Sequence, residues 1–158
     1  MKSKPTVKKS KTDKILNCLS RIILIGTTMF LICYWKYIPA QVPMHHDFAG
    51  NIDRWGAKGE LLILPILAWL IYALISILEH FPGSWNTGVT VTEENKERVY
   101  AVLLHMIITM KLSVVLIFSS LIIQSALLWE MPDWWLPAVL VIVFGPMGYY
   151  LYRLIKVK

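Results

Sequence analysis

Four long apolar runs, separated by short polar segments, constrain the fold of this chain more than any other feature. An uncharged apolar helix of about 20 residues crosses the ~30 Å hydrocarbon core of a bilayer. The runs lie at residues 15–35, 61–78, 112–129 and 134–152, and Arg21 is the one charged residue within them. Its long stem lets the guanidinium reach the membrane interface. We predict an all-α integral membrane protein whose four transmembrane helices form one bundle.

The positive charges fall mostly on one side of such a bundle. If both termini share a side, thirteen of the sixteen Lys and Arg residues lie there, and the other side holds Lys36, Arg54 and Lys58. Because cytoplasmic loops carry an excess of Lys and Arg, we predict cytoplasmic termini and a place in the cell (inner) membrane. Basic segments beside a bilayer attract anionic headgroups, so we expect lipid, and not nucleic acid, as their partner.

The polar segments divide the chain into a tail and a single membrane domain. Residues 1–14 are rich in lysine and are predicted to form a disordered cytoplasmic tail, and the membrane domain covers residues 15–158. Within that domain we predict an outer loop at residues 36–60 and a cytoplasmic region at residues 79–111. Trp129, Trp134 and Trp135 would form an aromatic belt at the outer surface.

The third helix is predicted to be longer than a membrane span. No helix breaker occurs between residues 93 and 129, which would make a continuous helix of about 55 Å. We expect it to extend into the cytoplasm with Lys111 at the inner interface, and a bend near Lys111 is the alternative. Its predicted start combines a Thr N-cap with acidic residues in the first turn and an i,i+4 Glu–Arg pair, and comprises Thr92, Glu93, Glu94, Asn95 and Arg98.

The sequence offers little of what ion transport or catalysis requires. Proton relays and ion paths usually need ionisable groups inside the membrane, and no carboxylate, His or Lys lies near the middle of any apolar run. Glu93, Glu94 and Arg98 match the EExxxR spacing of glutamic intramembrane peptidases, but the later His and Asn motifs of those enzymes do not follow. We therefore assign no catalytic residue and no cofactor.

The outer loop contains the stretch "VPMHHDFAGNIDRWGAKGE", which is either a polar connector or the working part of the protein. His45, Asp47 and Asp53 are metal-ligand types, although a site needs three or four converging ligands and the spacing matches no standard one. As a connector, the loop would use Gly50 and Gly56 in left-handed conformations, with the aspartates bonding to nearby backbone amides. Both interpretations remain open from the residues alone.

The wider run "YIPAQVPMHHDFAGNIDRWGAKGE" resembles a bacterial membrane domain of unknown function found at the N-terminus of SdpI-type immunity proteins. That family shows a proline-x-histidine, an Asn or Asp, a glycine, an Asp, a Trp-Gly pair and a lysine. Here these positions are Pro43, His45, Asp47, Gly50, Asp53, Trp55, Gly56 and Lys58. The "TEEN" run at residues 92–95 adds to the resemblance, which covers roughly residues 15–125. The family usually has an aromatic residue in place of His46.

The resemblance implies a non-enzymatic role. SdpI-type proteins protect a cell from a secreted toxic peptide and can hold a cytoplasmic repressor at the membrane, so the implied partners are a peptide toxin or a regulatory protein. We expect the outer loop to sense or block its ligand, in toxin immunity or envelope signalling. Two alternatives are a metal-dependent membrane hydrolase using His45, Asp47 and Asp53, and an assembly subunit of a membrane complex. Association of the chain with itself is compatible with each of these roles.

Overall fold

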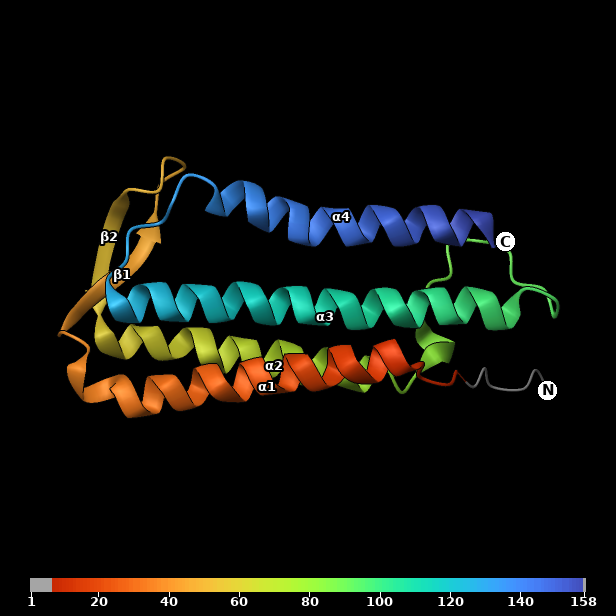
Figure 1. Ribbon diagram of the computed structural model, residues 1–158, viewed down its shortest axis with the longest axis horizontal. Helices are drawn as coiled ribbons and strands as arrows, with labels where there is room; N and C mark the ends of the chain where they lie inside the picture. Colours follow the sequence, from red (N-terminus) through yellow and green to blue (C-terminus); the bar gives the residue numbers. More distant parts are fainter. Residues whose placement is uncertain (1–6, 158) are drawn as a thin grey trace.

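The computed structural model describes residues 7–157, which form four long helices and one two-stranded sheet (Figure 1). The elements are α1 (Lys11–Tyr34), β1 (Gln41–His46), β2 (Ile52–Ala57), α2 (Ile63–Leu78), α3 (Lys96–Leu127) and α4 (Trp135–Lys156). Short 3-10 turns occupy Trp35–Tyr37, Lys58–Leu62 and Pro82–Ser84. With their adjoining turns, all four helices are long and apolar enough to cross a membrane. The predicted helical architecture with four such segments is confirmed.

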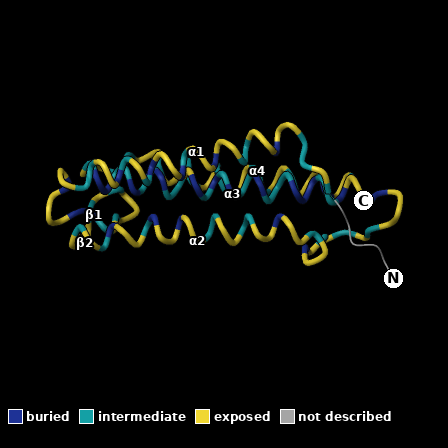
Figure 2. The backbone as a smooth tube through the Cα atoms, turned by 90° about the horizontal axis from the view of Figure 1, so that it is seen from below, coloured by how far each residue is buried: buried dark blue, intermediate teal, exposed yellow. Residues whose placement is uncertain are grey.

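α3 is the helix on which the others pack. α1, α2 and α4 each contact α3 more than they contact one another. Twelve residues of α3 are buried, against five of α1, two of α2 and one of α4, and Figure 2 shows the buried positions following α3. Small residues such as Ser119, Ser125 and Ala126 lie among them and allow neighbouring backbones to approach. The large apolar side chains on the outer faces are exposed, as a bilayer requires.

The start of α1 differs from the predicted boundary at residue 15. The helix begins at Lys11 because Ser10 and Asp13 form a capping box. The Asp13 amide donates to Ser10 Oγ at 3.1 Å, and the Ser10 amide donates to the Asp13 carboxylate at 2.7 Å. The predicted disordered tail is therefore wrong for residues 11–14, and residues 1–6 of that tail lie outside the described residues.

The start of α3 also differs from the prediction. Regular helix begins at Lys96, one turn after the expected start, and Asn95 is its N-cap residue. Thr92 still acts as a cap of the preceding turn, since its amide donates to Asn95 Oδ1 at 2.8 Å and its hydroxyl accepts from the Asn95 amide at 3.3 Å. From Lys96 the helix runs without interruption to Leu127, a length of about 48 Å.

The segment predicted to be an outer loop forms a β-hairpin, which corrects the all-α prediction. β1 and β2 pair antiparallel and lie across the ends of the helices, opposite the end of the molecule that holds both termini (Figure 1). Val42 of β1 is fully buried and packs with Leu31, Leu61 and Ile122. The segment forms strands because the buried Val42 and Pro43 hold the hairpin against the helices while most of its other residues stay in contact with solvent.

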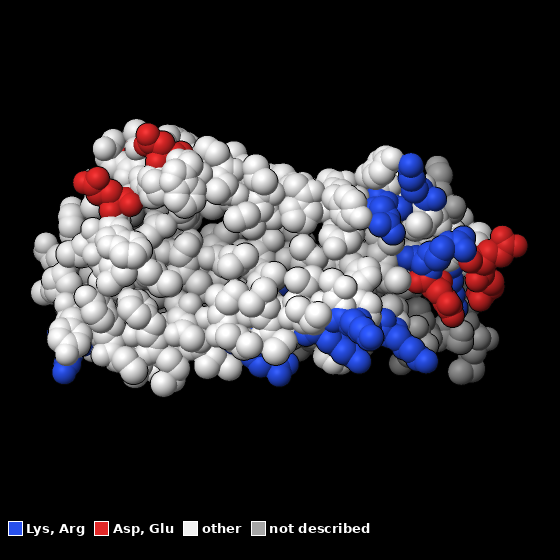
Figure 3. Space-filling view, viewed as in Figure 1, with Lys and Arg blue, Asp and Glu red and all other residues white. Residues whose placement is uncertain are grey.

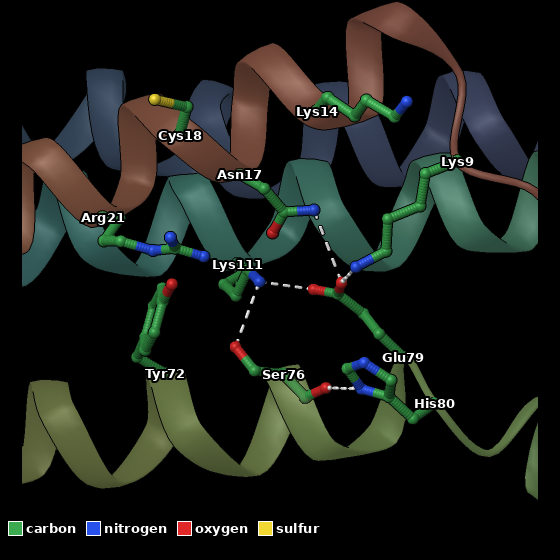
Figure 4. Close-up of a pocket in the computed structure, with 10 residues that line it drawn as sticks. All are labelled: Lys9, Lys14, Asn17, Cys18, Arg21, Tyr72, Ser76, Glu79, His80 and Lys111. Carbon is green, nitrogen blue, oxygen red and sulfur yellow. Dashed lines mark hydrogen bonds and ion pairs between the residues drawn. The ribbon is translucent and has the colours of Figure 1, made fainter.

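Buried ion pairs join α1, α2 and α3 at the end of the molecule that holds the termini. Glu79, which follows α2, is bonded to Lys111 of α3 and to Lys9 at 2.6 Å (Figure 4). Lys111 is also buried. Its ammonium donates to Ser76 Oγ at 3.1 Å. A second pair joins buried Asp13 of α1 to His105 of α3.

Replacing Glu79 with Gln should lower the free energy of unfolding by about 3–5 kcal/mol, because Lys111 then keeps a buried charge without its carboxylate partner. The combined variant Glu79→Gln with Lys111→Met should recover most of that loss, since no buried charge remains. Equilibrium unfolding in mild detergent measures both. Glu93→Gln, which removes an exposed partner of Lys96, is the control and should behave as wild type. A double variant as unstable as the single one would contradict this account of the pair.

Candidate functional site

The hairpin is the candidate site, and its register sets which side chains share a face. Gln41, Val42 and Pro43 face Ala57, Gly56 and Trp55, whereas His45 faces Arg54 and His46 faces Ile52. The pairing is therefore irregular on both sides of His45. Such bulges bend a strand and re-aim its side chains. Here the irregularity lets both histidines reach the same side of the hairpin, where both line one cavity.

The turn between the strands is built on the Asp47 carboxylate. Its Oδ1 accepts from the amides of Ala49 and Asn51, each at 2.9 Å, and the Asn51 side-chain amide donates to Oδ2 at 3.1 Å. These bonds, the Asn51 side chain foremost, lower the pKa of Asp47 from its usual value. Asp47 thus serves the local backbone, as expected for a structured connector.

Gly50 places this turn against the connection between α3 and α4. Its φ of +83° is a left-handed conformation that favours glycine, as predicted. A Cβ at this position would lie 2.4 Å from the backbone oxygen of Met131. Gly50 is therefore required both for the backbone conformation and for the close approach of two segments that are far apart in the sequence.

His45 and Asp53 face each other across the two strands. The His45 Nδ1 and Asp53 Oδ1 atoms are 2.6 Å apart, and both side chains remain partly exposed. They border a cavity of about 360 Å³ between the hairpin and the start of α4. The polar side of the cavity is His45, His46, Asp47 and Asp53, and its apolar side is Phe48, Met131, Trp135 and Leu136. The cavity can therefore bind a ligand with both charged and apolar groups.

His46 occupies a more enclosed position behind this cavity. Its Nε2 atom and Gln124 Oε1 of α3 are buried and have no hydrogen-bond partner within residues 7–157. Both residues line a second cavity of about 80 Å³, which is large enough for ordered water. Burial lowers the pKa of His46 from 6.5 and outweighs the opposing effect of Asp53. His46 is therefore neutral at physiological pH.

The remaining predicted loop residues support the hairpin instead of lining the larger cavity. Lys58 donates to the backbone oxygens of Trp35 and Ile38 at 3.1 and 3.3 Å, and its ammonium lies 5.0 Å from the centre of the Trp35 ring. Trp55 lies opposite Pro43, which lines the smaller cavity.

Gly56 differs from the prediction that it takes a left-handed conformation. It lies within β2, and the reason for glycine there is space. A Cβ would lie 2.7 Å from both the Glu60 carboxylate and the Met44 side chain. Glu60 in turn accepts from Arg54 at 3.0 Å and from the Ala57 amide at 2.9 Å. Gly56 thus leaves room for the carboxylate that closes this end of the hairpin.

The predicted cytoplasmic residues, Thr92, Glu93, Glu94, Asn95 and Arg98, lie at the opposite end of α3 from the hairpin (Figure 1). Buried Asn95 organises them, and its side-chain amide also donates to the Thr90 backbone oxygen at 3.0 Å. The ion pair formed here is Glu93–Lys96, at 3.7 Å, in place of the expected Glu94–Arg98 pair. These residues therefore shape a helix start and take no part in the hairpin cavity.

The geometry does not favour a metal-dependent hydrolase. Between residues 7 and 157, no group of three or more His, Cys, Asp or Glu side chains is placed to hold a metal ion. Of the three candidates, Asp47 is engaged by its own turn, whereas His45 and Asp53 pair with each other. The cavity residues that the sequence did not reveal are Phe48, Met131, Trp135 and Leu136, because only the contact between hairpin and α4 brings them together.

Gly50→Ala should loosen the hairpin, because the new side chain meets a left-handed backbone and the Met131 carbonyl. The left-handed conformation alone costs about 1–2 kcal/mol, so amide exchange in β1 and β2 should accelerate about tenfold or more. Hydrogen–deuterium exchange measures this. Gly59→Ala is the matched control, since its Cβ would meet open space, and it should leave exchange unchanged. Equal exchange in both variants would show that the turn tolerates the contact.

His46 should make the stability of the protein depend on pH. Because folding lowers its pKa below 6.5, its contribution is complete above about pH 6.5 and is lost as the pH falls toward the lower folded value. His46→Phe removes this titration. Thermal unfolding at several pH values between about 7.5 and 5 should show a steeper acid loss in wild type than in His46→Phe. Parallel curves for the two proteins would contradict the assignment.

Comparison with known proteins places a domain match over the hairpin. Residues 22–69 match the family described as "Domain of unknown function (DUF1648)". The matched segment covers the second half of α1, the whole hairpin and the start of α2. It therefore includes all eight loop residues that the sequence pattern singled out.

A relative and a search of solved structures complete the comparison. An "Uncharacterized protein" of Archaeoglobus fulgidus is 33% identical over 67 residues, which make up 42% of this chain and 37% of that protein. The chain thus matches little more than a third of this curated relative's length. No solved structure gives a match. The segment that holds the hairpin is therefore similar to a domain whose function is unknown.

Proposed function

We propose that this protein is a non-enzymatic, multi-pass membrane protein that recognises a cationic amphipathic peptide with its hairpin cavity. The observation that carries the proposal is the cavity of about 360 Å³ between the hairpin and α4, with carboxylates and histidines on one side and apolar side chains on the other. A peptide with basic and apolar residues complements both sides. Pockets that combine apolar walls with a few placed polar groups are the usual form of a binding site.

The charge of this end of the molecule supports a cationic ligand. Two acidic residues, Asp47 and Asp53, lie on the hairpin, and the connection between α3 and α4 adds Glu130 and Asp133. Figure 3 shows acidic atoms near the hairpin on this face, besides a second acidic group at the opposite end of the molecule. Of the three basic residues at this end, Arg54 is paired with Glu60, Lys58 is bonded to backbone oxygens, and the Lys36 ammonium lies 4.8 Å from the centre of the Tyr37 ring. A ligand cation would therefore approach mainly carboxylates. These attract the cation while it diffuses toward the protein and also favour its binding.

The proposed orientation places the hairpin outside the cell membrane and both termini in the cytoplasm. Figure 3 shows most of the Lys and Arg atoms of this face toward the end away from the hairpin, a few at the hairpin end, and a largely uncharged surface between them. The excess of basic residues at one end agrees with the positive-inside rule. In this orientation the helices form a four-helix bundle in the bilayer. α3, at about 48 Å, extends beyond the ~30 Å core on the cytoplasmic side.

The sequence resemblance supports a biological setting for such a site. The loop pattern resembles SdpI-type immunity proteins, and the domain match covers the same hairpin. A membrane protein that binds a toxic peptide at the outer surface would keep it from the bilayer, and the same binding event would serve envelope sensing. Immunity is therefore the role we propose first. His45 and Asp53 are the ligand contacts, and Asp47, Gly50 and Lys58 hold the hairpin in shape.

A protection assay tests this function. Peptide-sensitive bacteria that express the protein are challenged with a panel of secreted cationic amphipathic peptides and with charge-neutral versions of the same peptides. The wild type should raise the inhibitory concentration of at least one cationic peptide. His45→Ala and Asp53→Ala should each lower that protection by about tenfold, which corresponds to ~1.4 kcal/mol of lost binding.

Arg54→Gln is the matched control, because it changes a charge on the same hairpin that does not line the cavity. It should protect as well as wild type at equal membrane levels, checked by immunoblot. Full protection by His45→Ala and Asp53→Ala, or equal protection against the charge-neutral peptides, would reject the hairpin cavity as the binding site. Sensitivity of wild-type cells to every peptide in the panel would reject peptide immunity.

A further inference from the structure

A third cavity lies at the other end of the molecule, between α1 and α2. It has a volume of about 480 Å³, and Figure 4 shows Lys111 of α3 at its floor. Lys14, Cys18 and Arg21 line it from α1, at the i, i+4, i+7 spacing that places residues on one helix face. Tyr72 and Ser76 of α2, with Glu79 directly after that helix, line it at the same spacing. Two facing helix stripes therefore build this cavity.

The cavity carries an excess of positive charge. Lys9, Lys14, Arg21 and Lys111 line it, against Glu79 as the one carboxylate. Glu79 is bonded to both Lys9 and Lys111. Lys14 and Arg21 are exposed and have no carboxylate within salt-bridge distance among residues 7–157. These two cations are therefore available to an anion, whereas Lys9 and Lys111 are already bonded to Glu79.

The surroundings of the cavity indicate a ligand that arrives from the bilayer. α1 and α2 pack mainly on α3 and little on each other. Between the cavity and the hairpin, Trp69 of α2 bridges the two helices, since its indole donates to Thr28 Oγ1 of α1 at 3.0 Å. Arg21 lies within the apolar span that precedes this contact. An anion reaching that depth needs an apolar portion of its own.

We propose that this cavity binds the phosphate headgroup of an anionic phospholipid. Lys14 and Arg21 donate to the phosphate oxygens from α1, and the Tyr72 hydroxyl, toward which Arg21 extends in Figure 4, is a further donor from α2. A guanidinium suits the geometry of phosphate oxygens, whereas an ammonium adds a point charge. The acyl chains lie outside the cavity on the exposed apolar faces of α1 and α2, including Ile22 and Ile25.

This site explains why α1 carries an arginine inside an apolar run. Arg21 is expensive in hydrocarbon unless its charge is met by water or by an anion. A headgroup held between Lys14 and Arg21 meets that charge at the membrane interface. The bound lipid would also fill the space that α1 and α2 leave between them, since the two helices touch each other so little. The proposal does not depend on the peptide site at the hairpin.

Binding of short-chain phosphatidylglycerol to the purified full-length protein in a neutral detergent tests the site. Phosphatidylcholine with the same chains measures headgroup selectivity, and inorganic phosphate as competitor distinguishes a lipid from a free anion. The wild type should bind phosphatidylglycerol at least about tenfold more tightly than phosphatidylcholine. Inorganic phosphate at the same concentration should not displace it.

The variant Lys14→Gln with Arg21→Gln should weaken phosphatidylglycerol binding by about tenfold to thirtyfold, because it removes two positive charges that each attract the anionic headgroup. Both residues are exposed, so the fold should persist, and thermal unfolding checks this. Arg21→Lys should bind more tightly than the double variant and more weakly than wild type, because an ammonium keeps the charge but not the paired donors of a guanidinium. Lys156→Gln, a basic residue of α4 outside the cavity, is the matched control and should bind normally.

Four outcomes would overturn the proposal. They are equal binding of the two lipids, unchanged binding by the Lys14→Gln and Arg21→Gln variant, an equal loss in Lys156→Gln, and displacement by inorganic phosphate. The third outcome would show a diffuse surface attraction, and the fourth a site for a soluble anion. The protection assay for the hairpin involves neither Lys14 nor Arg21, so a failure there is separate from a failure here.

Discussion

The packing of three helices on α3 is the constraint on which the rest of this structure depends. α1, α2 and α4 bury few residues of their own and meet mainly through this one helix. In a bilayer the hydrophobic effect gives little help, so association relies on close contact between helices and on polar bonds between them. α3 supplies both, with small residues such as Ser119 along its length, the Ser113 hydroxyl that donates to the Ile142 carbonyl of α4, and Lys111.

The two ends of α3 are specialised in different ways. At the hairpin end, the buried contacts of Val42 are apolar and fix the strands against the helices, so that His45 and Asp53 border a cavity with Trp135. At the other end, buried Glu79, just after α2, is bonded to buried Lys111 of α3 and to partly exposed Lys9, just before α1. Burying an ion pair costs desolvation energy, but the bonds of the pair fix the relative positions of the segments that it joins. Here it holds the α1 and α2 stripes at a fixed spacing.

The sequence predicts the four helices well and their ends less well. Long apolar runs are unambiguous, but the capping pair Ser10 and Asp13 is hidden in a lysine-rich segment, and Thr92 precedes a first turn that is not regular helix. The hairpin could have been recognised from two six-residue segments around a glycine-containing turn. The mixture of Pro, His and charged residues hides the alternation that marks strands, so the region was expected to be a loop.

The site was predictable only in part. The histidine and aspartate pattern correctly directs attention to the hairpin, and Gly50 has the predicted left-handed conformation. Local sequence could not show that His45 pairs with Asp53 while Asp47 serves the turn, because the bulged register decides this. Met131 and Trp135 join the cavity through a tertiary contact, and the pairing of Glu79 with Lys111 arises in the same way.

The contact between Gly50 and the Met131 carbonyl has a consequence for variation among related chains. Two short segments, one before α2 and one after α3, meet backbone to backbone with no room for a side chain. A longer connection between α3 and α4, or a longer hairpin turn, would move one segment away from the other and open the cavity. Insertions at these two places should therefore occur together or not at all, so paired length changes would reveal the contact in an alignment.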